Sequence, residues 1–165
     1  MTVRQAHIND LDNILQVVEQ ARQMMRETGN MTQWSNGYPS AQTILDDIQS
    51  GHGFVIAHDG RTVGYFHFSH GQSPEPTYSV IKNGQWLNDK PYGVIHRLAS
   101  GRSVKGIAKA AFDYAFTAID TIRVDTHRDN LPMQNFLKKN GFAYCGIIYV
   151  NDGTPRDAFQ KTIST

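Results

Sequence analysis

The sequence predicts a mixed α/β domain in which helices cover both faces of one sheet. Segments with the two-residue period of strands alternate with segments of helical period, in the order β-α-α-β-β-β-α-β-α-β-β. Two turn dipeptides, Asp59-Gly60 and Asp152-Gly153, join pairs of strand-like segments. The chain has 165 residues, and domains usually span roughly 100–200 residues. We therefore treat residues 1–165 as a single domain.

The N-terminal part is predicted to contain one strand and two helices. Residues 2–7 alternate between polar and apolar side chains, as a strand does. Asn9 is the predicted N-cap of a helix whose apolar residues recur at helical spacing. Residues 30–39 form a loop, after which Ser40 caps a second helix that closes at Gly51.

The middle of the chain is predicted to be mostly strands. Residues 54–58 and 62–69 form a hairpin, and residues 92–99 form the next strand. Residues 70–91, which contain several prolines, are predicted to be irregular. A loop of this length within a compact domain is usually functional or mobile.

The C-terminal part alternates helices and strands. Apolar periodicity predicts helices over 106–119 and 131–140, separated by a strand over 122–126. Two further strands are predicted over 142–150 and 156–162.

Charge and composition exclude several classes of protein. Lys and Arg number 16 against 15 Asp and Glu, for a net charge of +1, so nucleic acid and anionic membranes are not expected partners. Cys145 is the one cysteine, which excludes an intrachain disulfide, and we interpret it as a buried, inert thiol. The histidines lack the spacing of metal ligands, so no metal site is predicted.

No apolar run approaches the roughly 20 residues of a membrane span, and residues 1–13 contain no apolar secretory core. We expect a cytoplasmic protein. A homodimer remains open, because no segment marks an interface.

The connection after residues 92–99 indicates an anion site. A small, basic loop over residues 100–105 leads into a helix that begins at Gly106. A helix start presents free backbone N–H groups and a positive dipole end, which suit a phosphate or pyrophosphate. The loop is not a P-loop, because Ile107 and Ala108 stand where that motif needs a lysine and a hydroxyl. The alternative is an ordinary strand–helix connection.

From Tyr92 onward, the sequence resembles the GNAT superfamily of acyl-CoA-dependent N-acetyltransferases. The first family pattern is matched by Leu98-Ala99-Ser100 and then Ser103-Val104-Lys105-Gly106-Ile107-Ala108. The second is matched by Asn130, Met133, Phe136, Leu137, Lys139, Gly141 and Phe142. The order of elements resembles the family over nearly the whole chain.

The resemblance implies a mostly antiparallel sheet that splays between its fourth and fifth strands, with acetyl-CoA as co-substrate. The pantetheine arm would pair with the backbone of Leu98, Ala99 and Ser100, and Asn130 would hydrogen-bond to it. The pyrophosphate would lie on the N–H groups of Ser103, Val104, Lys105, Gly106, Ile107 and Ala108.

Two histidines are candidates for the base that deprotonates an amine. His96 lies on the strand beside the expected thioester, and an imidazole suits general-base work near neutral pH. The alternatives are that His96 is a buried structural histidine or shapes the substrate pocket. His127, just past the neighbouring strand, is the second candidate and an expected substrate contact. Arg97 is expected to point to the face opposite His96, because side chains alternate along a strand.

The chain departs from the family pattern at the tyrosine that often protonates the leaving thiolate, which is replaced by Leu137. Tyr144 or a water molecule is expected in that role; the alternative is catalysis without a proton donor, because a thiolate is a fairly good leaving group. Trp34, Tyr38 and Trp86 lie in predicted loops and are candidates for the floor of the acceptor pocket, although each could simply cover the edge of the core.

We therefore expect an N-acetyltransferase that moves an acetyl group from acetyl-CoA to a primary amine, on a small molecule or a peptide, by direct attack. A non-catalytic acyl-CoA-binding or sensing module is the first alternative. A plain interaction domain on the same fold is the second.

Overall fold

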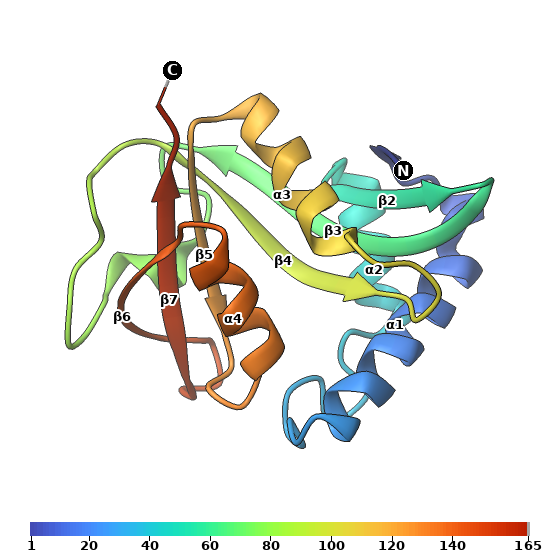
Figure 1. Ribbon diagram of the computed structural model, residues 1–165, viewed down its shortest axis with the longest axis horizontal. Helices are drawn as coiled ribbons and strands as arrows, with labels where there is room; N and C mark the ends of the chain where they lie inside the picture. The colour runs from blue at the N-terminus through green and yellow to red at the C-terminus, as the bar shows by residue number, and fades with distance from the viewer. Residues whose placement is uncertain (165) are drawn as a thin grey trace.

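A single seven-stranded sheet organises residues 1–164, the part of the chain that the structure describes, in the computed structural model (Figure 1). The strand order is β1-β2-β3-β4-β5-β7-β6. The strands are β1 (Thr2–Gln5), β2 (Gly53–His58), β3 (Arg61–Gly71), β4 (Tyr92–Ser100), β5 (Thr121–Thr126), β6 (Ala143–Tyr149) and β7 (Pro155–Thr162). Neighbouring strands are antiparallel except β4 and β5, which run parallel. The predicted fold class is confirmed.

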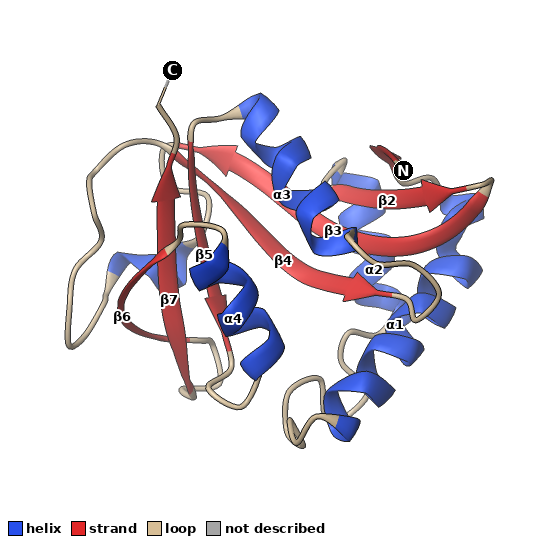
Figure 2. Cartoon of the chain, viewed as in Figure 1, coloured by secondary structure: helices blue, strands red, loops and turns tan. Residues whose placement is uncertain are grey.

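The helices lie on both faces of this sheet, as Figure 2 shows. They are α1 (Leu11–Glu27), α2 (Ala41–Ser50), α3 (Ile107–Ala118) and α4 (Leu131–Lys139), with short 3-10 helices η1 (Ile8–Asp10) and η2 (Pro76–Ser79). Helices α1 and α2 cover one face, and α3 covers the other. None of the helices in residues 1–164 has the length and apolar character needed to cross a membrane.

Alternation along β2 divides the core between these two faces. Phe54 and Ile56 pack in the cluster with α3, whereas Val55 packs in the cluster with α1 and α2. A register shift of one residue would exchange the two sets of side chains between the faces, so the buried faces specify the register.

The segment between β3 and β4 takes the place of a helix on the second half of the sheet. Its Tyr78 is buried with Tyr92, Val94 and Ile148, and Trp86 packs against this cluster. The long predicted loop is therefore a packed cover that contains the 3-10 helix η2. This cover holds residue 75 against the sheet.

Several predicted helix and turn signals have the expected geometry. The Ser40 hydroxyl accepts a hydrogen bond from the Thr43 amide at 3.2 Å, and Gly51 ends α2 with a φ of 79°. Asp59 and Gly60 both have positive φ, as a tight hairpin turn requires.

The predicted cap at Asn9 is wrong. Residues 8–10 form η1 instead, and the Asp10 carboxylate accepts the His7 amide at 2.8 Å. Arg4 also donates to Asp10, and this hydrogen bond lowers the pKa of Asp10 to about 2. The Asp10 carboxylate, and not the Asn9 side chain, therefore accepts the backbone N–H at the start of this segment.

Strands β4 and β5 diverge soon after they meet. Their pairing consists of Gly93 with Ile122 and Val94 with Arg123. Figure 2 shows β4 and β5 spreading apart beyond this point toward the C-terminal end of β4. A Cβ atom at Gly93 would lie 2.7 Å from the Phe68 ring and 2.9 Å from Ile122, so glycine allows the close approach. The expected splay between the fourth and fifth strands is confirmed.

Candidate active site

A cavity of about 580 Å³ lies where β4 and β5 diverge. Ile95 and Leu98 of β4 and Val124 of β5 line it, together with Phe112 of α3 and Met133 of α4. On its polar side the cavity is lined by Trp34, Tyr38, Glu75, His96, Arg97, Asp125, Asp152 and Arg156, among others. An apolar gap between two strands therefore continues into a chamber that contains ionisable groups.

A β-bulge in β4 places two consecutive side chains at this cavity. Arg97 has a φ of 52°, and the register with β3 shifts between Tyr65 and His67. Two residues of β4 therefore oppose one residue of β3, and the alternation of side chains is interrupted. The expectation that His96 and Arg97 point to opposite faces is wrong, since both line the cavity.

His96 is held by a carboxylate from the segment between β3 and β4. Its Nε2 atom lies 2.6 Å from Oε1 of Glu75. This hydrogen bond is the main reason that the pKa of Glu75 is lowered to about 2. An ionised Glu75 accepts the Nε2 proton, which leaves Nδ1 as the basic nitrogen of a neutral imidazole.

Glu75 is itself positioned by the start of η2. Its carboxylate accepts hydrogen bonds from the Thr77 amide at 3.2 Å and from the Thr77 hydroxyl at 3.0 Å. The residue thus acts as the N-cap of this short helix. Sequence analysis missed Glu75; its only signal was a capping residue followed by proline inside a long loop.

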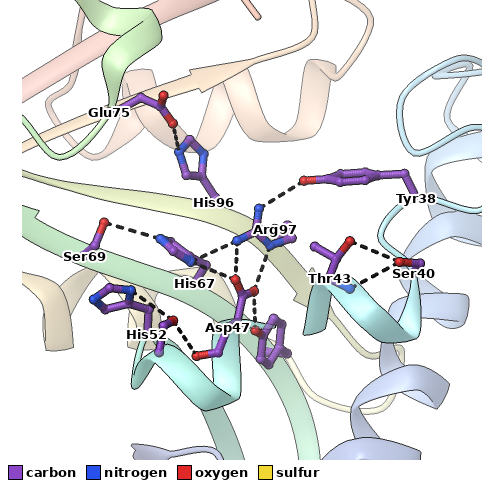
Figure 3. Close-up of polar contacts among 12 residues, drawn as sticks. Tyr38, Ser40, Thr43, Asp47, His52, His67, Ser69, Glu75, His96 and Arg97 are labelled. Atoms are coloured by element: carbon purple, nitrogen blue, oxygen red, sulfur yellow. Dashed lines mark hydrogen bonds and ion pairs between the residues drawn. The ribbon is translucent and has the colours of Figure 1, made fainter. Parts of the chain in front are cut away.

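Arg97 joins a buried polar network beneath the cavity (Figure 3). Its Nε donates to Oδ2 of Asp47 at 2.8 Å, and Nη2 donates to Oδ1 at 2.5 Å. Tyr65 donates to the same carboxylate at 2.6 Å. Burial favours the protonated acid, but the hydrogen bonds from Arg97 and Tyr65 hold the pKa of Asp47 well below its usual range. The positive charge of Arg97 is thus matched by a buried carboxylate.

His67 completes this network as a neutral ring. Arg97 donates to its Nδ1 at 2.9 Å, and its Nε2 lies 3.3 Å from the Ser69 hydroxyl. Burial lowers the pKa of His67, and the charge of Arg97 acts in the same direction. The His67 and His96 rings lie 5.5 Å apart, so the network supports the strand position from which His96 projects.

The segment between α1 and α2 closes one side of the cavity. Arg22 and Arg26 both donate to the Trp34 carbonyl, at 3.2 Å each. Trp34 is nearly buried, whereas Tyr38 is exposed and its hydroxyl accepts a hydrogen bond from Arg97 at 3.1 Å. Both aromatic residues line the cavity, at the place expected of an acceptor pocket.

Two hydrogen bonds link the segment between α1 and α2 to the residues that follow β5, across the gap between β4 and β5. The Thr32 hydroxyl lies 3.0 Å from Nε2 of His127, and the Asn130 amide donates to Gln33 at 3.1 Å. Asn130 also caps α4, accepting the Met133 amide at 3.2 Å. Asn130 lines the cavity as predicted for a cofactor contact, but its side chain is engaged by the protein.

The turn before α3 has backbone N–H groups without protein partners. The Gly101 amide donates to Val63 at 2.8 Å and the Arg102 amide donates to Gln20 at 3.2 Å. Within residues 1–164, the amides of 103–108 donate no hydrogen bond to the protein. Gly106 has a φ of 85° at the start of α3, a conformation that favours glycine. The predicted pyrophosphate site thus has free donors.

The three residues predicted to pair with the cofactor arm lie at the end of β4. Leu98 lines the cavity and is half-buried, whereas the Ala99 side chain is buried in the cluster with α1 and α2. Ser100 pairs with Gly64 of β3. Among residues 1–164, no strand pairs with the edge of β4 that faces β5 beyond Val94.

Three residues predicted for catalysis or for the acceptor do not line the cavity. Trp86 packs on Tyr78 with 5.1 Å between ring centroids and donates to the Tyr78 carbonyl, so it covers the core. Tyr144 is half-exposed on β6 and packs edge-on against Phe159. His127 is engaged through Nε2 with Thr32, and its Nδ1 accepts the Asp129 amide at 3.1 Å. Both nitrogens of His127 are therefore occupied, which removes it as the base.

Leu137, at the position of the family's tyrosine, is fully buried in the core cluster with α3. Neither this position nor Tyr144 supplies a proton donor at the cavity.

Asp125 is a second carboxylate that the sequence analysis missed. It is half-buried on β5, lines the cavity and accepts a hydrogen bond from the Tyr78 hydroxyl at 2.6 Å. Burial, reinforced by Asp125, raises the pKa of Tyr78 well above its usual value, so the phenol stays a neutral donor. The sequence signal for Asp125 was its position near the end of β5, the strand beside the gap.

Comparisons with known proteins agree with this geometry. The family model for the acetyltransferase (GNAT) domain matches residues 1–143. No curated protein matches the chain. The structure of a GNAT-family acetyltransferase from Streptococcus agalactiae is similar, with 33% sequence identity and a TM-score of 0.89, covering 99% of this chain and 96% of that one.

More distant structures show the same fold. A GNAT-family acetyltransferase from Listeria monocytogenes has 20% identity and a TM-score of 0.69, covering 98% of this chain and 94% of its own. One from Bacillus cereus has 18% identity and a TM-score of 0.60, with 99% and 98% covered. At sequence identities of 18% and 20%, these similarities show a shared fold only.

Proposed function

Because the chain belongs to the GNAT acetyltransferase family, we propose that it transfers an acetyl group from acetyl-CoA to a primary amine by direct attack. The observation that carries the proposal is the Glu75–His96 pair, at a cavity that opens between β4 and β5. This pair has the form of an oriented general base, which amine acetylation needs because an ammonium ion is not a nucleophile.

The free donors of the chain suit a diphosphate and an extended arm. The amides of residues 103–108 lack protein partners within residues 1–164, and they lie at the N-terminus of α3. Anions are favoured there by the N–H groups and by the helix dipole. The unpaired edge of β4 near Leu98 is suited to hydrogen bonds with amide groups of a pantetheine arm. When bound, acetyl-CoA supplies an activated acyl group as a thioester.

In this proposal, His96 accepts a proton from the amine through Nδ1. The amine nitrogen forms a bond to the acetyl carbon, the C–S bond of the thioester breaks, and CoA leaves as the thiolate. Glu75 holds the Nε2 proton and thereby fixes the tautomer in which Nδ1 carries the lone pair. The carboxylate also stabilises the imidazolium that forms after proton transfer. Glu75 is thus a positioning residue, and His96 is the catalytic base.

Direct attack agrees with the absence of a suitable nucleophilic thiol. Cys145 is buried on β6, and burial raises the pKa of its thiol, which disfavours the reactive thiolate. A covalent acyl-enzyme on this residue would also lie outside the cavity lining.

The proposal is tested by binding and turnover with the whole chain. CoA binding is measured by calorimetry, and acetyl transfer to a panel of primary amines is measured by release of free thiol from acetyl-CoA. We expect CoA to bind and at least one class of amine to be acetylated. CoA binding without turnover across the panel would support an acyl-CoA-binding module, and no CoA binding would refute the proposal.

A further inference from the structure

The charges that line the cavity are unequally matched. Two arginines, Arg97 and Arg156, face three carboxylates, Glu75, Asp125 and Asp152. Arg97 is matched outside this set by the buried Asp47, to which it donates two hydrogen bonds. The arginine nearest the base is therefore electrically neutralised before any substrate arrives.

Arg156 is matched within the turn between β6 and β7. Its Nη1 donates to the Thr154 hydroxyl at 2.9 Å, and that hydroxyl donates to Asp152 at 2.6 Å. The Thr154 oxygen thus links the cation to the anion. Arg156 and Asp152 are therefore linked through one hydroxyl at the exposed edge of the cavity, without a direct ion pair within residues 1–164.

The other two carboxylates of the cavity, Glu75 and Asp125, differ in their hydrogen-bond partners. Glu75 is held by the imidazole of His96, as described above. Asp125 receives one neutral phenol hydrogen bond at Oδ2, from Tyr78, and within residues 1–164 it has no ion-pair partner. A half-buried carboxylate with one neutral donor is incompletely compensated.

Asp125 lies on the same side of the sheet as His96. The Tyr78 ring that donates to Asp125 is 6.4 Å from the His96 ring, measured between centroids. Tyr78 is buried and held by Trp86, so this spacing is rigid. The cavity thus places a base and a separate, uncompensated carboxylate across the gap between β4 and β5, beside the aromatic residues Trp34 and Tyr38.

We propose that Asp125 forms an ammonium-binding subsite, so that the acceptor carries a second cationic group besides the amine that is acetylated. Diamines and polyamines have this chemistry. A carboxylate recognises an ammonium ion by a charge-assisted hydrogen bond, and the faces of Trp34 and Tyr38 are suited to an alkyl chain or a cation. An amino acid is disfavoured because its carboxylate would face Glu75 and Asp125, while Arg97 is paired with Asp47 and Arg156 is linked through Thr154 to Asp152. This inference rests on the proposed function and specifies its acceptor.

Three acceptors of similar length test the subsite: 1,4-diaminobutane, n-pentylamine and 4-aminobutyrate, which end in an ammonium, a methyl and a carboxylate group. We expect kcat/KM to be at least about tenfold higher for the diamine than for n-pentylamine. In Asp125→Asn the diamine should lose about tenfold or more, mainly through KM, whereas n-pentylamine should be unaffected. The carboxamide oxygen of this variant can still accept the Tyr78 hydrogen bond, so the fold should be retained. Asp46→Asn, an exposed carboxylate on α2, is the matched control.

A binding measurement separates the subsite from the chemistry. In the presence of saturating CoA, diaminobutane should bind the natural chain more tightly than Asp125→Asn by calorimetry. Equal use of diamine and monoamine, a preference for aminobutyrate, or an equal loss for both amines in Asp125→Asn would overturn the subsite. In those cases transfer to n-pentylamine would leave the proposed function standing. Failure to bind CoA would instead refute the proposed function.

Discussion

The Nε2 atom of His96 lies 2.6 Å from Oε1 of Glu75, although 21 positions separate the two residues in the chain. The contact forms because the segment between β3 and β4 folds back over β4 and is held there by the buried Tyr78. His96 thus has a fixed ring orientation at a cavity that also receives Arg97, through the bulge in β4. The predictions below separate the roles of these groups.

His96→Gln should lower kcat by about 10²- to 10⁴-fold, the usual contribution of a general base. The Kd for CoA should change little, because His96 is on β4 and is not part of the turn at residues 103–108 that is proposed to bind the diphosphate. Steady-state kinetics and calorimetry measure the two quantities. An unchanged kcat would rule out His96 as the base.

Glu75→Gln should lower kcat, because a neutral carboxamide does not orient the His96 ring or stabilise the imidazolium formed on proton transfer as a carboxylate does. Steady-state kinetics with a primary amine measure the change. Glu27→Gln, an exposed glutamate on α1 that pairs with Arg102, is the control. An unchanged kcat in Glu75→Gln would contradict the positioning role of Glu75.

The same variant should change stability at acidic pH. The pKa of Glu75 is lowered from 4.5 to about 2 in the folded chain. Its stabilisation is therefore present above pH 4.5 and lost as the pH falls toward 2. Chemical denaturation across this range should show a smaller acid-side loss of stability in Glu75→Gln than in the natural chain, and an identical loss would contradict the hydrogen bond to His96.

Gly106→Ala should weaken CoA binding. Gly106 has a φ of 85°, and a side chain in the left-handed region costs about 1–2 kcal/mol, so relaxation of the turn would displace the free amides. Gly29→Ala is the matched control, with a φ of 89° and open space around the added Cβ. Both variants should lose similar stability, and only Gly106→Ala should lose affinity. Equal CoA affinities would contradict the anion site.

Arg97→Met should destabilise the fold by about 3–5 kcal/mol, because it leaves a buried carboxylate without its cation. The side chains of Arg97 and Asp47 are 15% and 7% exposed. The ion pair holds the pKa of Asp47 low, so its stabilisation is complete above about pH 4 and lost below it. Urea denaturation at about pH 7 should show the loss, whereas Arg102→Met, which breaks an exposed pair, should leave the midpoint nearly unchanged.

Tyr144→Phe should leave kcat within about twofold of the natural value, because Tyr144 lies outside the cavity lining and removal of an uninvolved hydroxyl has no transition-state cost. Tyr149→Phe, another half-exposed tyrosine of β6, is the control. A loss of about tenfold confined to Tyr144→Phe would restore Tyr144 as the acid that protonates the thiolate.

Local signals in the sequence predicted most of the fold. Ser40, Gly51 and the Asp59-Gly60 turn act through neighbours a few residues away, and each has its predicted geometry. The bulge at Arg97 was not predictable in this way, because it arises from packing between β3 and β4. One inserted residue reversed the expected direction of a side chain.

The candidate site was predictable only in part, for a related reason. His96 lies on a strand and the turn at residues 103–106 leads directly into α3, so strand periodicity and the helix start located them. Glu75 lies on the irregular segment between β3 and β4, and Asp125 of β5 receives its hydrogen bond from Tyr78 of the same segment. These tertiary contacts carry no periodic signal. The same segment also packs Trp86 against Tyr78, whereas the sequence analysis placed Trp86 in the acceptor pocket.

Two residue pairs join β4 to β5, and the hydrogen bonds Thr32–His127 and Gln33–Asn130 connect the two halves again at the wide end. The two halves of the molecule are thus joined at a short strand pairing at one end and by polar side chains at the other. The width of the opening between β4 and β5 therefore depends on these two hydrogen bonds. A substitution at Thr32 or Gln33, which both line the cavity, would therefore also change the separation of β4 and β5.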